Sequence, residues 1–213
     1  MTYYNETLND QWIVEHVFPG KREGYFVEAG AANGKAASSC YILETSLDWR
    51  GICIEPNDRF FGELLLNRPN SLCENLCISD KPGVVTFVQG ENDDSYFSGI
   101  RTNLEQFKWG SHEILHKGEE VTKQAVTLES LLEKHQAPKL IDYGAFDIEG
   151  SELAVLKSFP FDRYRFLAMS LECDEWVWEI LLPILTKQGY REVRNPFNPD
   201  KIWEKYCLHE SII

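Results

Sequence analysis

The sequence has no apolar stretch long enough to cross a membrane and no N-terminal segment typical of a secretory signal. A membrane-spanning helix needs about 18 or more apolar residues in a row, and the longest apolar runs here fall far short of that length. Residues 1–6 lack both the basic region and the apolar region of a signal peptide. We therefore expect a cytoplasmic protein without a membrane partner.

Cysteine pairs with the spacing of a zinc site are also missing. The nearest pair among the six cysteines, Cys73 and Cys77, does not match the C-x-x-C pattern of zinc-binding motifs. Cys53, Cys173 and Cys207 lie in or beside apolar, strand-like runs, where a reduced thiol behaves as a small apolar side chain. We expect reduced thiols buried in the core.

Basic residues are few and scattered. The 21 Lys and Arg residues against 34 Asp and Glu residues give a net charge of −13, and no local basic cluster would offset the repulsion of a phosphate backbone. Nucleic acid is therefore not an expected partner. With 14 Gly, 9 Pro and 43% hydrophobic residues, the chain does not resemble a disordered protein, and its 213 residues predict a single domain over 1–213.

Short β-branched runs alternate with helix-like segments along the whole chain. The expected strands are 25–28, 51–55, 72–78, 84–88, 139–148, 166–172, 190–193 and 201–208. The expected helices are 36–47, 59–67, 127–135, 151–158 and 175–188. This alternation predicts an α/β fold with a mostly parallel sheet covered by helices on both faces, and an antiparallel final pair of strands.

One segment, 89–124, is polar and only weakly periodic. A stretch of that length without regular structure is unusual in a compact domain unless it is functional or disordered. We interpret it as an insertion near the functional site, partly helical over 103–116.

A glycine turn follows the first expected strand. Residues 28–34 have the pattern E-x-G-x-x-x-G, which differs from the G-x-G-x-x-G fingerprint that approaches a dinucleotide pyrophosphate. The spacing is similar to the first motif of class I S-adenosylmethionine methyltransferases. A turn needed only for packing a helix on a strand is the alternative.

Carboxylates stand at the ends of three further strands. Glu55 ends the second expected strand, 25 residues after Gly30. An acid at this place can accept hydrogen bonds from both ribose hydroxyls of a nucleoside cofactor. Asp147 ends a later strand, before Gly150 and a helix start. Glu172 ends the strand after that. In open α/β sheets, ligands lie at these carboxyl ends.

Five segments, taken together and in order, resemble the FkbM-family methyltransferases. They are 26–34 (FVEAGAANG), 49–57 (WRGICIEPN), 78–80 (ISD), 127–132 (TLESLL) and 146–156 (FDIEGSELAVL). The one departure is Asn33, in a turn where the family more often has Ala-Asn-Asp-Gly.

The resemblance implies a Rossmann-like class I fold, with a seven-stranded sheet whose last strand is antiparallel, and S-adenosylmethionine as cofactor. It also implies the cofactor-binding residues. These are Glu28, Gly30, Asn33, Gly34, Glu55, Ile78, Ser79 and Asp147. The acceptor it implies is a hydroxyl on a sugar, a glycoside or another small secondary metabolite.

Methyl transfer to a hydroxyl needs a base or an acidifying metal ion, because a neutral hydroxyl is a poor nucleophile. Asp147 is the first candidate for either role and Glu172 is the second. Together with Asp174 they would suit a divalent cation such as Mg²⁺. His112 and His116, four residues apart in the insertion, are further candidates for the base.

Three alternatives remain open at this stage. The aromatic residues within 95–99 would either line the ligand site or pack in the core. The protein would either be an active enzyme or a module that binds the cofactor without catalysis, and an active enzyme would act on a small molecule or on a protein. The oligomeric state is also open, a homodimer being one option.

Overall fold

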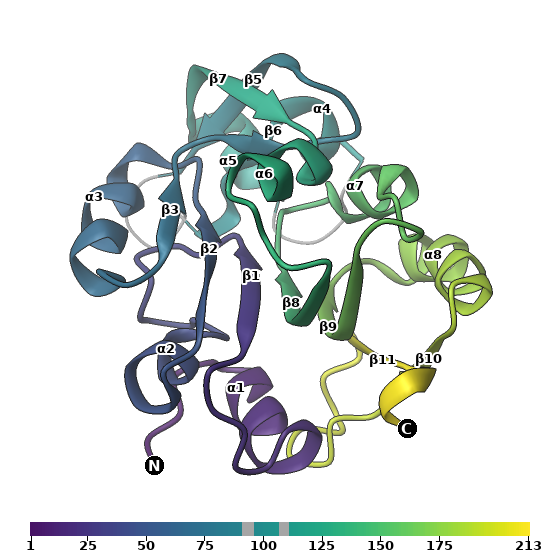
Figure 1. The fold of residues 1–213 in the computed structure, drawn as a ribbon. Helices are drawn as coiled ribbons and strands as arrows, with labels where there is room; N and C mark the ends of the chain where they lie inside the picture. The colour runs from purple at the N-terminus through teal and green to yellow at the C-terminus, as the bar shows by residue number, and fades with distance from the viewer. Residues whose placement is uncertain (91–95, 107–110) are drawn as a thin grey trace.

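The computed structural model describes residues 1–90, 96–106 and 111–213, without the side chains of residues 111 and 112. Its main sheet has seven strands in the order β10-β11-β9-β8-β1-β2-β3 (Figure 1). In chain order these are β1 (Tyr25–Ala29), β2 (Arg50–Ile54), β3 (Leu72–Glu74), β8 (Leu140–Phe146), β9 (Arg165–Glu172), β10 (Tyr190–Val193) and β11 (Glu204–His209). All neighbouring strands are parallel except that β11 is antiparallel to both β9 and β10. The predicted α/β fold is confirmed.

Helices cover both faces of this sheet, as predicted. One face packs against α6 (Leu128–Lys134), α7 (Glu152–Ser158) and α8 (Glu175–Lys187). The other face packs against the π-helix η1 (Trp12–Val17), α2 (Tyr41–Leu47) and α3 (Asp58–Asn67). The alternation of a strand explains the division: on β1, Val27 and Ala29 enter the first core and Phe26 the second.

Several helix ends follow the local sequence rules. Asn57 and Thr127 cap α3 and α6, because their side-chain oxygens accept hydrogen bonds from the amides of Arg59 and Ser130. The chain leaves α8 through Gly189, whose φ of 84° suits the left-handed turn that ends many helices. The remaining helices are short: α1 (Asn9–Gln11), α4 (Arg101–Leu104), α5 (Ser111–Lys117) and the 3₁₀ helix η3 (Glu210–Ile212).

A second sheet of four strands lies beyond the carboxyl ends of the parallel strands, in the order β4-β7-β5-β6. Its strands are β4 (Cys77–Ile78), β5 (Gly83–Gln89), β6 (Gly99–Ile100) and β7 (Glu119–Val126). Two expectations were wrong here. The expected strand 72–78 is two strands in different sheets, because Asn75 turns away and donates to the carbonyls of Glu55 and Pro56.

The second error is that no strand was expected at the end of the insertion, where residues 119–124 begin the long strand β7, which pairs with β5 over seven residues. Its sequence hides this strand because only Lys123 and Ala125 are buried and most of its other side chains are exposed. Part of the segment, 91–95 and 107–110, lies outside the described residues.

The expected helix 36–47 begins five residues late, at Tyr41. Ala37 has a left-handed φ of 58°, and the chain that follows wraps around the carboxylate of Glu28. The Ser38 hydroxyl and the Ser39 amide each donate to Glu28 Oε1 over 2.7 Å. A buried carboxylate thus takes the backbone donors that a longer helix would have used.

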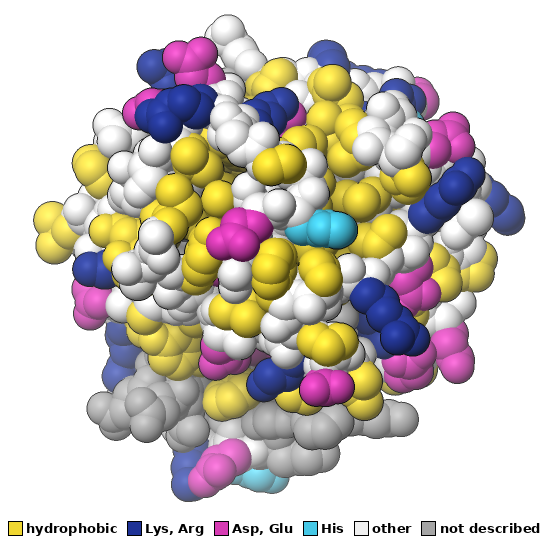
Figure 2. Space-filling view, turned by 90° about the horizontal axis from the view of Figure 1, so that it is seen from below, with side chains coloured by type: hydrophobic (Ala, Val, Ile, Leu, Met, Phe, Trp, Pro, Cys, Tyr) yellow, Lys and Arg dark blue, Asp and Glu magenta, His cyan; other side chains and the backbone are white. Residues whose placement is uncertain are grey.

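All six cysteines are free thiols, and five of them are buried. No helix within the described residues is long and apolar enough to span a membrane. Figure 2 shows one face of the molecule, on which basic and acidic side chains stand in small groups among apolar ones.

Candidate active site

A cavity of about 440 Å³ lies between the carboxyl ends of β1, β2, β8 and β9 and the second sheet. This volume is within the range of about 300–1,000 Å³ that is usual for small-molecule sites. Strand ends, two loops and the second sheet all contribute to it, so residues far apart in the sequence meet around one space. Of the predicted site residues, five line it. These are Gly30, Glu55, Ile78, Asp147 and Glu172.

Gly30 allows β1 and β8 to end side by side at the cavity. Its φ is 82°, and a Cβ atom there would lie 1.8 Å from the carbonyl oxygen of Asp147. The Asp147 amide donates to the carbonyl of Ala29 over 3.0 Å. No side chain fits at this position, so the glycine sets how closely the turn and the Asp147 backbone approach each other.

Glu55 presents its carboxylate at the end of β2. Its Oε2 accepts from the Ala32 amide over 2.8 Å, and its Oε1 accepts from the Asn57 amide over 2.6 Å. Burial raises the pKa of Glu55 to about 7, against the lowering effect of these two hydrogen bonds. The carboxylate therefore joins the glycine turn to the start of α3, and each oxygen keeps a free lone pair for a ligand hydroxyl.

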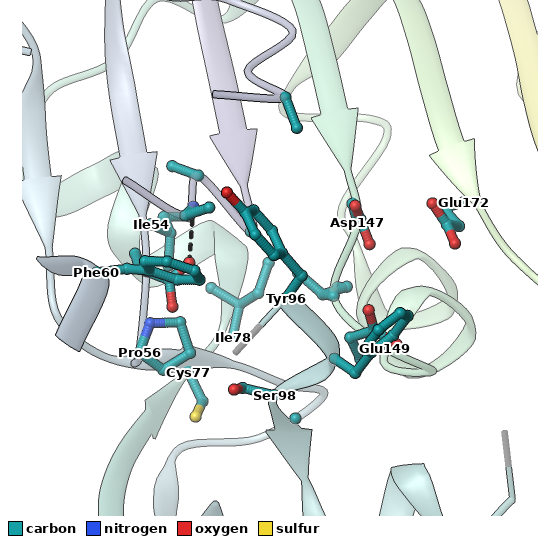
Figure 3. Close-up of a pocket in the computed structure, with 18 of the residues that line it drawn as sticks. Ile54, Pro56, Phe60, Cys77, Ile78, Tyr96, Ser98, Asp147, Glu149 and Glu172 are labelled. Atoms are coloured by element: carbon teal, nitrogen blue, oxygen red, sulfur yellow. Dashed lines mark hydrogen bonds between the residues drawn. The ribbon is translucent and has the colours of Figure 1, made fainter. Parts of the chain in front are cut away.

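Opposite walls of the cavity differ in chemistry (Figure 3). One wall is apolar. It contains Ile54, Pro56, Phe60, Cys77, Ile78, Phe87 and Ile100. The other wall is acidic, and in Figure 3 Asp147 and Glu172 lie next to each other with Glu149 below them. Tyr96 lies between the walls, with its ring centroid 4.9 Å from that of Phe60. An adenine base suits the apolar wall and a cation suits the acidic one.

The three carboxyls of the acidic wall all have raised pKa values. The side chain of Asp147 is open to the cavity but surrounded by protein, and this desolvation, together with the neighbouring Glu204 and Glu152 carboxylates, raises the pKa of Asp147 well above its usual value. Burial, followed by the charge of Asp147, raises the pKa of Glu172 to about 8. Burial and the charges of Asp147 and Glu172 also raise the pKa of Glu149. Groups that titrate near neutral pH can exchange protons with a substrate.

A sequence model of the Methyltransferase FkbM domain matches residues 28–192, well over half of the chain. The chain belongs to the FkbM methyltransferase family. As a member of this family it is an S-adenosylmethionine-dependent methyltransferase. The match begins at Glu28, at the end of β1, and extends to Glu192 in β10, so it includes every strand end that lines the cavity.

No curated protein matches this FkbM-family chain in sequence. Solved structures with a similar fold include a human methyltransferase 10 domain containing protein, at 11% identity over 95% of this chain and 78% of the other, with a TM-score of 0.48. Another is a fibrillarin pre-rRNA processing protein from Methanococcus jannaschii, at 15% identity over 91% and 70%, with a TM-score of 0.45. A third is Aeropyrum pernix fibrillarin with natively bound S-adenosyl-L-methionine, at 15% identity over 90% and 69%, also with a TM-score of 0.45.

Four predicted cofactor residues of this FkbM domain do not line the main cavity. Glu28 is engaged by the 38–40 turn and by Arg68, and it borders only a smaller neighbouring cavity. Asn33 closes its own turn by accepting from the amides at 35 and 36. Gly34 packs against Leu64 and Arg68. Ser79 donates its amide to the carbonyl of Val126.

The predicted histidines and the third metal ligand also lie away from the cavity lining. His116 is exposed on α5, and the side chain of His112 is outside the described residues. Asp174 is buried at the start of α8, where its Oδ2 accepts from the Trp176 indole. Within the part of the chain that the structure describes, no three His, Cys, Asp or Glu side chains are grouped to hold a metal ion.

Several lining residues have no role that the sequence assigns, among them Glu6, Phe60 and Glu149. Phe60 is on α3, shortly after the family segment 49–57, and Glu149 is within the family segment 146–156. Closeness to these motifs is therefore a sequence signal for both residues. Glu6 had no signal, because a residue near the N-terminus reaches the site only through the folded chain. Tyr96 and Phe97, the aromatic residues within 95–99, both line the cavity, which agrees with the first of the two alternatives for these side chains.

Proposed function

We propose that this methyltransferase transfers a methyl group from S-adenosylmethionine to a hydroxyl group of a sugar, a glycoside or another small metabolite. The observation that carries the proposal is the side chain of Asp147, which is exposed to the cavity at the end of β8 and accepts no hydrogen bond within the described residues. A carboxylate at that place is available to a reacting hydroxyl.

The residues around the cavity fit the cofactor. Glu55 would bind the ribose hydroxyls, and the apolar wall with Ile78 would hold the adenine. The acidic wall would face the positive charges of the sulfonium and the ammonium. When bound, S-adenosylmethionine supplies an activated methyl group with an excellent leaving group, so the protein needs mainly to position and deprotonate the acceptor.

In this proposal Asp147 is the general base. It accepts the hydroxyl proton on a carboxylate oxygen as the acceptor oxygen becomes nucleophilic. Its raised pKa makes it a stronger base than an ordinary aspartate, which favours proton transfer from the hydroxyl. Glu172 lies beside Asp147 and raises the charge density of the wall, which disfavours both carboxylates being ionised at once. Glu172 would therefore take up a proton in exchange with Asp147.

A magnesium-dependent form of the reaction is a second proposal. Asp147 and Glu172 both line the cavity, as a shared cation would require, whereas Asp174 does not. Removal of divalent ions with a chelator, followed by Mg²⁺ addition, separates the two forms. Activity that survives the chelator supports the base alone, and activity that returns only with Mg²⁺ supports the metal.

The experiment that tests the function is an acceptor screen with a labelled methyl donor, using sugars, glycosides and phenols beside a set of proteins. Label in a small hydroxylated compound supports the proposal. Label only in proteins favours the protein-methylating alternative. Cofactor binding without transfer to any of these acceptors favours the inactive binding module.

A further inference from the structure

The cavity is lined by acids and by no bases. Five carboxylates face it, whereas none of its lining residues in the described part of the chain is Lys, Arg or His. They are Glu6, Glu55, Asp147, Glu149 and Glu172. An acceptor with a net negative charge would meet these carboxylates and no basic side chain among the described lining residues. The lining thus selects against anionic acceptors.

Glu149 differs from Asp147 and Glu172 in this wall because it is buried, whereas Asp147 is exposed and Glu172 is partly exposed. Its residue is only 7% exposed, yet its carboxylate accepts no hydrogen bond and forms no ion pair within the described residues. Its neighbour Glu152 accepts from the Ile148 amide over 2.8 Å through Oε1, while Glu152 Oε2 is buried without a partner among the described residues. A buried carboxylate without a partner costs free energy, and the protein retains this one with its side chain at the cavity (Figure 3).

The backbone at Glu149 is also held in a costly conformation. Its φ is 51°, in the left-handed region that few residues other than glycine adopt. The turn is fixed on both sides, because Glu152 binds the amide of Ile148 and the Ser151 hydroxyl accepts from Asn103 over 2.7 Å. Strain of this kind persists where the surrounding structure imposes it, and it concentrates at ligand sites.

The methyl donor does not account for the whole wall. It carries a sulfonium, an ammonium and a carboxylate, so its net charge offsets a single carboxylate. Two aromatic side chains, those of Tyr96 and Phe97, also line the cavity and are partly exposed. Aromatic faces attract ammonium groups, as carboxylates do.

We propose that the methyl acceptor carries a protonated amine next to its reacting hydroxyl, as in an amino sugar or an amino alcohol, and that Glu149 binds the ammonium. This inference rests on the proposed function. An ammonium held by a carboxylate has no lone pair, so it recognises and orients the molecule while the neutral hydroxyl receives the methyl group. The raised pKa of Glu149, caused by burial and by Asp147 and Glu172, agrees with a site that lacks its cation.

The test uses three small probes of matched shape: ethanolamine, N-acetylethanolamine and glycolate. Each is titrated at matched ionic strength, in the millimolar range, into ¹⁵N-labelled protein saturated with S-adenosylhomocysteine, and the amides of 148–150 are followed by NMR. A charged hydrogen bond is worth about 1.5–3 kcal/mol, so we expect ethanolamine to bind at least about tenfold more tightly than N-acetylethanolamine. Glycolate should leave these amides unshifted.

Glu149→Gln should abolish the preference for ethanolamine, whereas Glu179→Gln, an exposed change on α8, should preserve it. If the NMR spectrum shows that the Glu149→Gln variant does not fold, the comparison of the three probes with the wild-type protein still tests the inference. Equal binding of the amine and its acetylated form, binding of glycolate, or no saturable shift with ethanolamine overturns the inference. Failure of S-adenosylhomocysteine to bind in the first step overturns the proposed function instead, so the two failures are distinguished.

Discussion

Arg68 and Glu28 form a buried ion pair beneath the glycine turn, with Arg68 Nη1 2.7 Å from Glu28 Oε2. The same guanidinium binds Glu44 of α2 through Nε, also in the interior. Glu28 Oε1 in turn receives the donors of the 38–40 turn. Arg68, at the end of α3, therefore ties β1, α2 and the turn into one unit that shapes the cofactor side of the cavity.

Arg68→Ala should destabilise the protein strongly, because it leaves two buried carboxylates without their cation. Breaking a buried pair in this way costs about 3–5 kcal/mol, which urea unfolding measures. Affinity for S-adenosylmethionine should fall as well, because the 30–40 segment loses its anchor. Arg163→Ala is the matched control: its pairs with Glu129 and Glu133 are exposed, and its urea midpoint should stay almost unchanged. Equal effects of the two variants would contradict this view of Arg68.

Gly30→Ala should disrupt the end of β1 and the cavity. The added methyl would overlap the carbonyl of Asp147 at 1.8 Å, and a φ of 82° is itself unfavourable for alanine. We expect a loss of more than about 1 kcal/mol in the free energy of unfolding, and at least a tenfold loss of cofactor affinity by calorimetry.

Gly62→Ala tests whether that loss is specific to Gly30. Gly62 lies within α3, with open space around the position of a Cβ atom. Alanine there should stabilise the helix by up to about 1 kcal/mol and leave cofactor affinity unchanged. Retention of cofactor affinity in Gly30→Ala would show that the close approach to Asp147 is not required.

The buried carboxyls predict that stability falls as pH rises. Burial raises the pKa of Glu55 to about 7, and that of Glu152 and Glu204 to about 8. Each group keeps its proton in the folded protein at a pH where the unfolded chain, with a carboxyl pKa of about 4.3, has lost it. Between about pH 4.5 and 8 the folded state binds more protons, so the free energy of unfolding decreases with rising pH.

Denaturant unfolding of the ligand-free protein at pH 5, 6, 7 and 8 measures this slope. Each carboxyl whose pKa is raised by more than one unit contributes more than about 1 kcal/mol over the window. Glu152→Gln keeps an acceptor for the Ile148 amide but removes the charge, so it should flatten the slope. A stability that is constant or rises with pH would contradict the raised pKa values.

Asp147→Asn should lower turnover by about 10²–10⁴-fold, the usual contribution of a general base, and leave cofactor affinity within a few-fold. Radiolabelled methyl transfer and calorimetry provide the two readouts. Glu172→Gln should have a smaller effect on turnover, because in the proposal it exchanges a proton with Asp147 and does not contact the hydroxyl proton. Full activity in Asp147→Asn would remove it from the role of base.

The main sheet could be predicted well from the sequence, because its strands are short apolar runs and the glycines and acids that end them are adjacent in the sequence. The prediction failed where long-range contacts decide the structure. The expected helix 36–47 begins only at Tyr41, because residues 38–40 donate hydrogen bonds to the buried Glu28 carboxylate. Strand β7 has no clear apolar pattern in the sequence, because few of its side chains are buried. For the same reason, Glu55 and Asp147 could be placed at the site from strand ends, whereas Glu6 could not.

We infer that the cavity binds S-adenosylmethionine through Glu55 and the glycine turn. Titration calorimetry of the wild type and of Glu55→Gln with S-adenosylmethionine tests it most directly. We expect one site per chain in the wild type, and an affinity at least about tenfold weaker in Glu55→Gln, since a neutral amide replaces a charged acceptor of the ribose hydroxyls. No binding by the wild type at millimolar cofactor, or equal binding by both proteins, would contradict it.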